Sequence, residues 1–318
     1  MKPHPLVTIA IPTYNRADTF LRPALEGALN QTYPNLEIIV ADNGSTDNTA
    51  AVVKRYRDSR IRYFRQPVNI VPNENFNFCL RQARGTYFQL LLDDEQIDPD
   101  FVETCLRVAD FSDDFGLLRT GLRTIDANGN VIGETPNLAA GLSLDEFFLA
   151  WFAGRTTLYL CNTLFHRATL LASGGFQSRH NLFQDVMAQA RVAAIRPRAD
   201  SPLIKATTRL HRAQYTYAAT VRAWCEDSRD LLELISGVAA ARRELVHERG
   251  ARFFAMIGYS RASSIRSPLA RARAYAMVYR SFERRYMPPL RMALSSTAMY
   301  RSLRQIKRRL LGRPAWVD

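Results

Sequence analysis

Short apolar runs alternate with segments of helical periodicity through the first hundred residues. The mostly apolar runs over 6–11, 36–41 and 87–92 are typical of buried strands, and residues 61–65, IRYFR, predict a further strand. The segments between them predict helices over 19–31, from about 47 to 57, and over 73–84, with Asp18 as the expected N-cap of the first and Gly85 ending the last. This alternation predicts an α/β fold with a parallel, nucleotide-binding type of sheet and right-handed crossovers.

The stretch YFQLLLDDEQIDPDF, residues 87–101, carries the strongest chemical signal. Its apolar run ends directly in three acids, Asp93, Asp94 and Glu95, at the carboxyl end of a predicted buried strand. Open α/β sheets bind ligands at this end of their strands, and oxygen ligands suit a hard divalent cation. The alternative is a solvated acidic loop followed by a helix start, because acids are common near helix N-termini.

The other predicted strands also end in polar residues. Tyr14 and Arg16 follow the first strand, and Asp42 and Asn43 follow the second. Because parallel strands end at one edge of the sheet, we expect these side chains to share a rim with Asp93 and Asp94. This convergence favours a binding site at that rim.

Beyond residue 110 the pattern changes. Residues 115–125 and 130–132 predict a hairpin-like pair, 143–152 a helix, and 158–160 a short strand. From residue 217 the pattern is helical, with helices expected over 223–248 and 251–287 before Pro288-Pro289 interrupts them. We therefore predict two parts, a catalytic domain over 1–215 and a helical region over 216–318.

Charge divides the chain in the same way. The net charge is +13, but residues 205–318 hold 23 Lys and Arg against 8 Asp and Glu, whereas the first 204 residues hold 20 against 22. Residues 290–311 place Met299, Leu303, Ile306 and Leu310 on one helical face beside several arginines, which suits an anionic membrane surface. Packing on the catalytic domain or pairing of two copies of the chain are the alternatives. A nucleic-acid partner is not expected, because the basic region carries no recognised RNA or DNA motif.

Four separated cysteines without a CxxC pair suggest no zinc or redox motif and fit a reducing compartment. No signal-peptide pattern and no apolar run of about 20 residues is present. We expect a cytoplasmic location, with peripheral attachment to the inner face of the cell membrane if the basic helix binds lipid.

Two blocks of the chain resemble the family 2 glycosyltransferases, which have the GT-A fold. The first is VTIAIPTYNRADTFLRPALEGALNQTYPNLEIIVADNGSTDNT, and the second is NENFNFCLRQARGTYFQLLLDDEQIDPDF. The resemblance covers roughly the first 110 residues closely and extends weakly to about residue 215. A P-loop lysine and a GxGxxG motif are both absent, which argues against an NTPase or a dinucleotide enzyme.

The resemblance implies a nucleotide-sugar site and a divalent cation, Mn²⁺ or Mg²⁺. Its donor-binding positions fall on Pro12, Tyr14, Arg16, Asp42, Asn43, Arg84 and Asp93. Asp94 matches the direct metal ligand, and His211, in an Arg-x-His element, matches a residue that completes the metal shell or contacts the diphosphate. An unremarkable surface or core histidine is an equal alternative for His211.

Asp185 matches the family's catalytic base. It follows Gly174-Gly175-Phe176 and stands in a Gln184-Asp185 pair where the family usually has Glu-Asp. An acceptor hydroxyl is a poor nucleophile until a carboxylate takes its proton, so the chemistry requires such a group. The alternative is an ordinary acid in the first turn of a helix.

The predicted function is metal-dependent, inverting transfer of a sugar from a UDP- or dTDP-linked donor to a hydroxyl of a glycan or lipid-linked acceptor in surface polysaccharide synthesis. The departures from the family pattern at Asn43, Glu95 and Gln184 favour an alternative, a nucleotide-sugar-binding protein without transferase activity.

Overall fold

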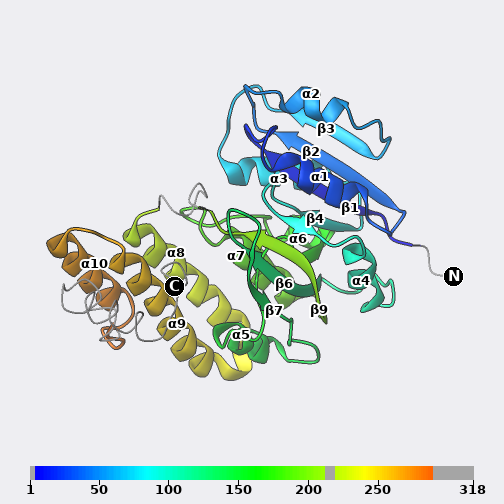
Figure 1. Ribbon diagram of the computed structural model, residues 1–318. Helices are drawn as coiled ribbons and strands as arrows, with labels where there is room; N and C mark the ends of the chain where they lie inside the picture. The colour runs from blue at the N-terminus through cyan, green and yellow to red at the C-terminus, as the bar shows by residue number, and fades with distance from the viewer. Residues whose placement is uncertain (1–3, 212–218, 289–318) are drawn as a thin grey trace, which may run out of the picture.

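The computed structural model describes residues 4–211 and 219–288. Its first half is the predicted parallel sheet, formed by β1 (Val7–Thr13), β2 (Leu36–Asp42), β3 (Ile61–Arg65) and β4 (Tyr87–Leu90) in the spatial order β3-β2-β1-β4. The connecting helices are α1 (Leu21–Leu29), α2 (Thr49–Lys54) and α3 (Pro72–Gln82) (Figure 1). All four expected strands are confirmed.

The sheet continues beyond β4 with mixed directions, in the order β4-β8-β6-β9-β5. Strands β8 (Thr163–His166) and β6 (Leu117–Ile125) are antiparallel to their predecessors, and β9 (Arg198–Arg209) then runs parallel to β6. The short β5 (Gln96–Ile97) closes this edge, and β7 (Val131–Thr135) forms the expected hairpin with β6. A parallel nucleotide-binding half joined to a mixed half is the architecture expected of a GT-A fold.

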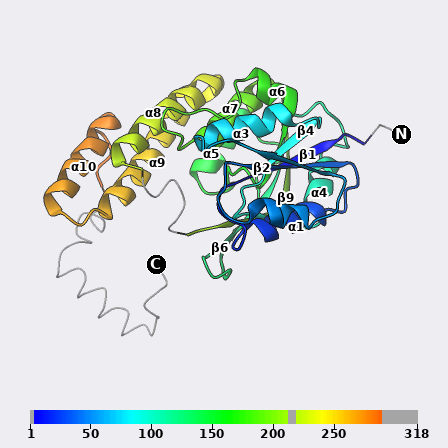
Figure 2. The same cartoon turned by 90° about the horizontal axis from the view of Figure 1, so that it is seen from above.

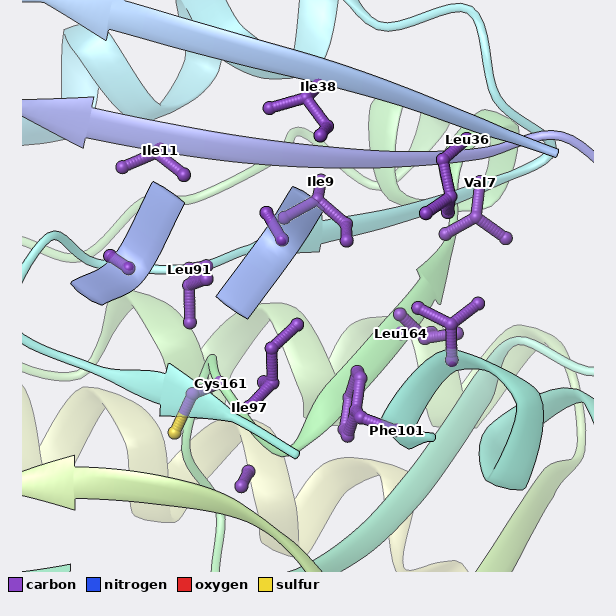
Figure 3. Close-up of a cluster of buried hydrophobic side chains, with 14 of the residues drawn as sticks. Val7, Ile9, Ile11, Leu36, Ile38, Leu91, Ile97, Phe101, Cys161 and Leu164 are labelled. Carbon is purple, nitrogen blue, oxygen red and sulfur yellow. The ribbon is translucent and has the colours of Figure 1, made fainter. Parts of the chain in front are cut away.

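Helices cover both faces of the sheet (Figure 2). On one face, α1 and α4 (Phe101–Arg107) pack against an apolar cluster that includes Ile9, Ile38 and Phe101 (Figure 3). On the other face, α3, α6 (Arg167–Ala172) and α7 (Gln184–Ile195) bury a second cluster around Phe88 and Phe176. Burial on both faces explains why β1, β2 and β4 are mostly apolar, whereas the edge strand β3 is only partly buried and carries Arg62 and Arg65.

A third apolar cluster joins the helical C-terminal part to the sheet domain. It is built by α5 (Leu144–Phe152), α7, α8 (Val221–Val238), α9 (Arg243–Ser263) and α10 (Pro268–Ser281). The helix expected over 223–248 is divided, because α8 ends at Val238 and a 3₁₀ turn over Ala240–Arg242 leads into α9. In the described ranges, no helix is both long and apolar enough to cross a bilayer. The predicted domain boundary near residue 215 and the basic helix over 290–311 lie outside the described residues.

Three local predictions are wrong. Helix α1 begins at Leu21 with Phe20 as its N-cap, and Asp18 lies before the helix in exposed chain. Residues 158–160 are irregular, and the strand begins later, at Thr163. Helix α3 ends at Gln82 with Ala83 as its C-cap, so Gly85 does not end it. Tertiary hydrogen bonds hold each of these places, from the Ala17 N–H to the Asp47 carboxylate, from Asn162 to the Thr120 carbonyl and from the Gly85 N–H to the Thr8 hydroxyl.

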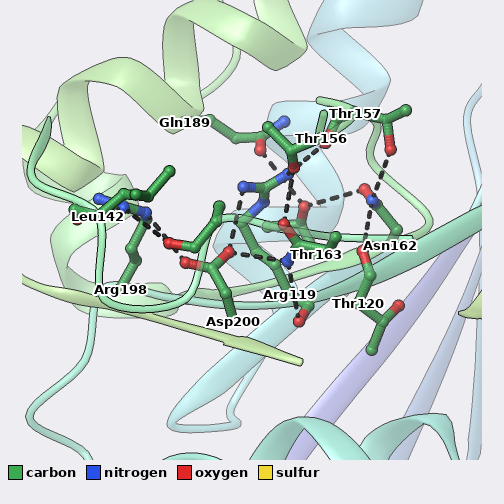
Figure 4. A network of polar contacts seen from close by, with 12 residues as sticks. Arg119, Thr120, Leu142, Thr156, Thr157, Asn162, Thr163, Gln189, Arg198 and Asp200 are labelled. Carbon is green, nitrogen blue, oxygen red and sulfur yellow. Dashed lines mark hydrogen bonds and ion pairs between the residues drawn. The ribbon is translucent and has the colours of Figure 1, made fainter. Parts of the chain in front are cut away.

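A buried polar network holds the irregular segment 156–162 (Figure 4). Arg119, fully buried on β6, donates to the hydroxyl of Thr156 and to the carbonyl of Thr157, and it pairs with Asp200 at 3.3 Å. Asn162 donates to the carbonyl of Thr120 at 2.9 Å. Side chains thus satisfy backbone groups that a strand would have paired, because buried polar groups need partners.

Candidate active site

A cavity of about 1370 Å³ opens at the carboxyl ends of β1 and β4. It exceeds the usual size of a small-molecule pocket, which is about 300–1,000 Å³. Its walls come from the first-strand loop, the acidic segment, the start of α7, the end of β9 and the helices α8, α9 and α10. The predicted site residues that line it are Pro12, Tyr14, Arg16, Asn43, Asp93, Asp94, Asp185 and His211.

The loop after β1 is held in a fixed shape by the loop after β2. Asn15 adopts a positive φ of 53°, its N–H donates to the Ser45 hydroxyl at 2.9 Å, and its side-chain oxygen accepts from the Thr46 N–H at 2.8 Å. Tyr14 is left 40% exposed at the cavity wall, and the Arg16 guanidinium lies 5.5 Å from the Phe20 ring centre. An exposed aromatic ring beside a cation suits a nucleotide base and its phosphates.

Asp42 and Asn43 are both buried, and their side chains are committed to the fold. Asp42 accepts hydrogen bonds from the Ser45 N–H at 2.7 Å and from the Tyr63 hydroxyl. The Asn43 amide donates to the carbonyl of Ile70 at 2.8 Å and accepts from its N–H at 3.0 Å. Asn43 lines the cavity, whereas Asp42 is not among the lining residues. The expected contacts of this pair with a base and ribose stay predictions.

Arg84 lies away from the cavity. Its backbone N–H donates to the Glu37 carboxylate at 2.9 Å, and its side chain, 69% exposed, approaches the same carboxylate at 3.9 Å. Glu37 stands near the beginning of β2, whereas the cavity lies at the ends of the parallel strands. The structure thus contradicts the expected placement of Arg84 on the donor side.

The acidic segment and the end of β9 form the centre of the site. The Asp94 carboxylate lies 2.7 Å from Nε2 of His211, and the Asp93 carboxylate accepts from the Thr13 hydroxyl at 2.8 Å. Burial, followed by the Asp94 charge, raises the pKa of Asp93 to about 7. Glu95 is buried at the cavity wall, with its carboxylate accepting from the Leu92 N–H at 3.2 Å, and burial, followed by the Asp94 charge, raises its pKa to about 8.

This donor set fits a divalent cation in part. Adjacent carboxylates that are costly to ionise together are relieved by a cation, and oxygen and imidazole ligands suit Mn²⁺ and Mg²⁺. Among the described residues, however, no three His, Cys, Asp or Glu side chains converge closely enough to hold an ion by themselves. Asp94 and His211 would therefore supply part of a coordination shell, and a bound diphosphate would supply the rest.

Asp185 lies in the first turn of α7 with its carboxylate at the cavity wall. It accepts from the Val186 N–H at 2.8 Å, and burial raises its pKa to about 6. Tyr159 lies nearby, since burial and then the Asp185 charge raise its pKa to about 12. A buried carboxylate that is ionised near neutral pH meets the requirement for a general base.

Several cavity residues were not expected from the sequence. Tyr159 comes from the irregular segment 156–162, and Trp224, Phe253 and Arg261 come from the helical part. The Arg261 guanidinium lies 3.5 Å from the Trp224 ring centre. No short motif marks these positions, because Trp224, Phe253 and Arg261 reach the cavity through the packing of α8 and α9, and Tyr159 reaches it through an irregular segment.

Comparison with known proteins agrees with this architecture. Residues 8–131 match the family model for glycosyl transferase family 2. Over 141 residues the chain is 36% identical to a chondroitin synthase of Escherichia coli, and over 135 residues it is 32% identical to a hyaluronan synthase of Pasteurella multocida. These matches cover 43% and 42% of this chain but only 20% and 14% of the relatives' length.

Solved structures resemble nearly the whole chain. TarS of S. aureus in complex with UDP-GlcNAc matches with a TM-score of 0.60 and 17% identity, over 90% of this chain and 82% of that one. A mannosyltransferase of Pyrobaculum calidifontis in complex with GDP-Man and Mn²⁺ matches with a TM-score of 0.54 and 16% identity, over 98% and 86%.

The sheet order and the structural matches define the GT-A class of fold. Within that class, residues 8–131 belong to glycosyltransferase family 2, which confirms the family identified from the sequence.

Proposed function

We propose that the protein is a metal-dependent, inverting glycosyltransferase. It would move a sugar from a nucleotide-sugar, UDP- or dTDP-linked, to a hydroxyl of a glycan or lipid-linked acceptor in surface polysaccharide synthesis. The observation that carries the proposal is the shared cavity, which holds the Asp93, Asp94 and His211 group and the buried Asp185 carboxylate. The UDP-GlcNAc bound to TarS supports a nucleotide-sugar donor, and the names of the chondroitin and hyaluronan synthases support a glycan acceptor.

Asp185 is the proposed general base. With a pKa of about 6 it is ionised at pH 7 to 8, and it is basic enough to accept a proton from an acceptor hydroxyl as that oxygen attacks. One base acting on one attacking oxygen supports a direct displacement, so we expect inversion at the anomeric carbon. Asn in place of Asp185 would keep the hydrogen bond from Val186 but could not accept the proton.

Asp94 and His211 are the proposed metal-holding residues, with Asp93 beside them. A bound cation would offset the charge that develops on the departing diphosphate. Thr13 orients Asp93 through the 2.8 Å hydrogen bond, and Arg16 at the same wall would add positive charge near the phosphates.

The helical side of the cavity is the proposed acceptor side. Its wall is formed by aromatic and apolar side chains, including Trp151, Phe253 and Met277, with Arg261 among them. Aromatic faces suit the apolar faces of sugar rings or a lipid chain, and an arginine suits an anionic group. A cytoplasmic enzyme that works at the inner face of the cell membrane agrees with such an acceptor.

Thermal unfolding tests the donor and metal parts of this proposal. The wild type, Asp94→Ala and the exposed-acid control Asp113→Asn would be melted with UDP, dTDP, GDP and their sugars, with and without Mn²⁺ or Mg²⁺. A ligand at 100 times its Kd adds roughly 2.7 kcal/mol to the folded state. We expect one nucleotide to stabilise the wild type and the control only with metal, and Asp94→Ala to lose the effect. Stabilisation that is equal in all three proteins would refute the metal role of Asp94.

A further inference from the structure

We infer that Asp227, on helix α8 of the C-terminal part, is a positioning residue for the proposed base Asp185. The inference rests on the proposed function. It concerns residues 176–183, the segment that leads directly into α7. Asp227 has no counterpart in any of the motifs recognised in the sequence.

The Asp227 carboxylate is the point around which this segment turns. Its side chain is completely buried, and its two oxygens accept from the His180 N–H at 2.9 Å and the Leu182 N–H at 3.1 Å. Asn181, between these donors, adopts a positive φ of 58°. The backbone therefore wraps around one carboxylate, three residues before Asp185.

The other end of the segment is held by the sheet domain. Asn77 of α3 pairs with the backbone of Phe176, donating to its carbonyl at 2.9 Å and accepting from its N–H at 2.9 Å. Gly175 precedes this pair with a positive φ of 69°, and a Cβ there would collide with the Asn77 side chain. The segment is thus fixed at both ends, by α3 and by α8.

The three acids of α8 that meet the segment differ in how much they can control it. Asp230 pairs with the exposed Arg179, and Glu226 lies 2.7 Å from Nε2 of the partly exposed His180. Only Asp227 is both buried and bonded to backbone N–H groups. Hydrogen bonds from backbone donors to a buried carboxylate are stronger than exposed side-chain pairs, so Asp227 affects the position of the backbone most among the three acids. The Ser178 hydroxyl also accepts from the Leu182 N–H, at 3.1 Å, but it is neutral and belongs to the segment itself.

This arrangement makes the helical part a component of the catalytic site rather than an appendage. A general base works only within hydrogen-bond reach of the proton that it takes, and a misplacement of about 1 Å can cost roughly 100-fold in rate. The proposed donor site is formed by the loops after β1 and β4, whereas the hydrogen bonds of Asp227 go to the segment before α7. Loss of Asp227 should therefore lower kcat and leave nucleotide affinity unchanged.

The test compares Asp227→Asn with Asp230→Asn, which removes only the exposed ion pair on the same helix. Turnover is followed as UDP released from UDP-GlcNAc, or from the nucleotide-sugar selected by the melting screen, and nucleotide affinity is measured by calorimetry. We expect Asp227→Asn to lower kcat by roughly 10- to 100-fold with nucleotide Kd within twofold of wild type. Asp230→Asn should stay within threefold in both quantities.

A matched pair at Asn181 covers the case in which Asp227→Asn does not fold. Asn181→Gly and Asn181→Ala remove the same side chain, but only alanine is strained by the positive φ. A lower kcat for alanine than for glycine, with equal nucleotide Kd, supports the inference. Equal kcat values in this pair would overturn the inference. A folded Asp227→Asn with wild-type kcat would also overturn it, as would an Asp227→Asn variant that loses kcat and nucleotide binding in parallel. Failure of the proposed function is a different result: the wild-type protein itself would then neither bind a nucleotide nor turn over a nucleotide-sugar.

Discussion

Replacing Asp185 with asparagine should remove turnover and at the same time stabilise the protein. The carboxylate is held in a buried site where burial raises its pKa from 3.8 to about 6, which means that the folded protein resists its ionisation. Asparagine has the same shape and can still accept the hydrogen bond from the Val186 N–H, so the substitution removes little besides the charge. The protein would thus lose a reactive group and a source of instability together.

The size of the gain follows from the two pKa values. Between pH 4 and 6 the folded protein binds more protons at Asp185 than the unfolded chain does, so stability falls as pH rises and then levels off. One pKa unit corresponds to about 1.4 kcal/mol, so the cost above pH 6 is about 3 kcal/mol. We expect Asp185→Asn to be more stable than wild type by up to about 3 kcal/mol at pH 8, with almost no difference at pH 4.

Urea unfolding of the metal-free, nucleotide-free proteins at pH 4, 6 and 8 measures this difference. The same preparations would be assayed for turnover, and the wild-type kcat/KM should fall below pH 6 as the base becomes protonated. If the difference in unfolding free energy between Asp185→Asn and the wild type is the same at all three pH values, the folded protein does not disfavour ionisation of Asp185. Wild-type turnover in Asp185→Asn would remove it as the base.

The remaining predictions concern the fold that supports the site. Arg119→Met should lower the free energy of unfolding by about 3 to 5 kcal/mol in urea titrations, because it breaks a buried ion pair. Arg107→Met, which breaks an exposed pair within one helix, should cost less than about 1 kcal/mol. Equal costs for the two substitutions would contradict the role of burial. Gly44→Ala should lower the free energy of unfolding by about 1 to 3 kcal/mol, because the φ of Gly44 is 76° and a Cβ there would lie 2.8 Å from the Val68 carbonyl carbon. Gly133→Ala should be nearly neutral, because open space surrounds that position. A neutral Gly44→Ala in urea unfolding would refute the expected strain. Ser143→Ala should cost about 1 kcal/mol in thermal melts through loss of a capping box on α5, and an unchanged melting temperature would show that tertiary packing alone holds this helix.

The parallel half of the fold was predictable because its signals are local. Three of its four strands are mostly apolar runs with a polar end, and the wide spacing of the strands requires helical crossovers. In the mixed half the β6-β7 hairpin was predictable, but β9 was not, because it contains Arg198, Asp200 and Lys205 and lacks an apolar run. Its charges are accommodated by partners distant in sequence, such as Arg119, which no local pattern reveals.

The candidate site divides in the same way. The positions of Asp93, Asp94 and Asp185 at one cavity follow from motif order and strand ends. The prediction put Arg84 at the wrong end of the sheet, because the motif locates the residue in the sequence but does not show to which end of the strands its side chain points. Trp224 and Asp227 were invisible because their contacts depend on how α8 packs, and helix packing is decided by three-dimensional complementarity rather than by residue type.

The strand order has a consequence for how the chain can be cut. Residues 8–131, which match the family model, contain β4 and β6 but not the strands that pair with them on the far side of the sheet. Strand β8, which lies between β4 and β6 in the sheet, begins only at Thr163, and the other neighbour of β6 is β9, which comes later still. A fragment that stops at residue 131 would therefore leave one edge of β4 and both edges of β6 without their strand partners. Unpaired edges recruit other chains, so such a fragment should aggregate during synthesis. Residues distant in sequence thus protect the parallel half, because one edge of its strand β4 stays unpaired until the polypeptide has been made as far as β8, which ends at His166.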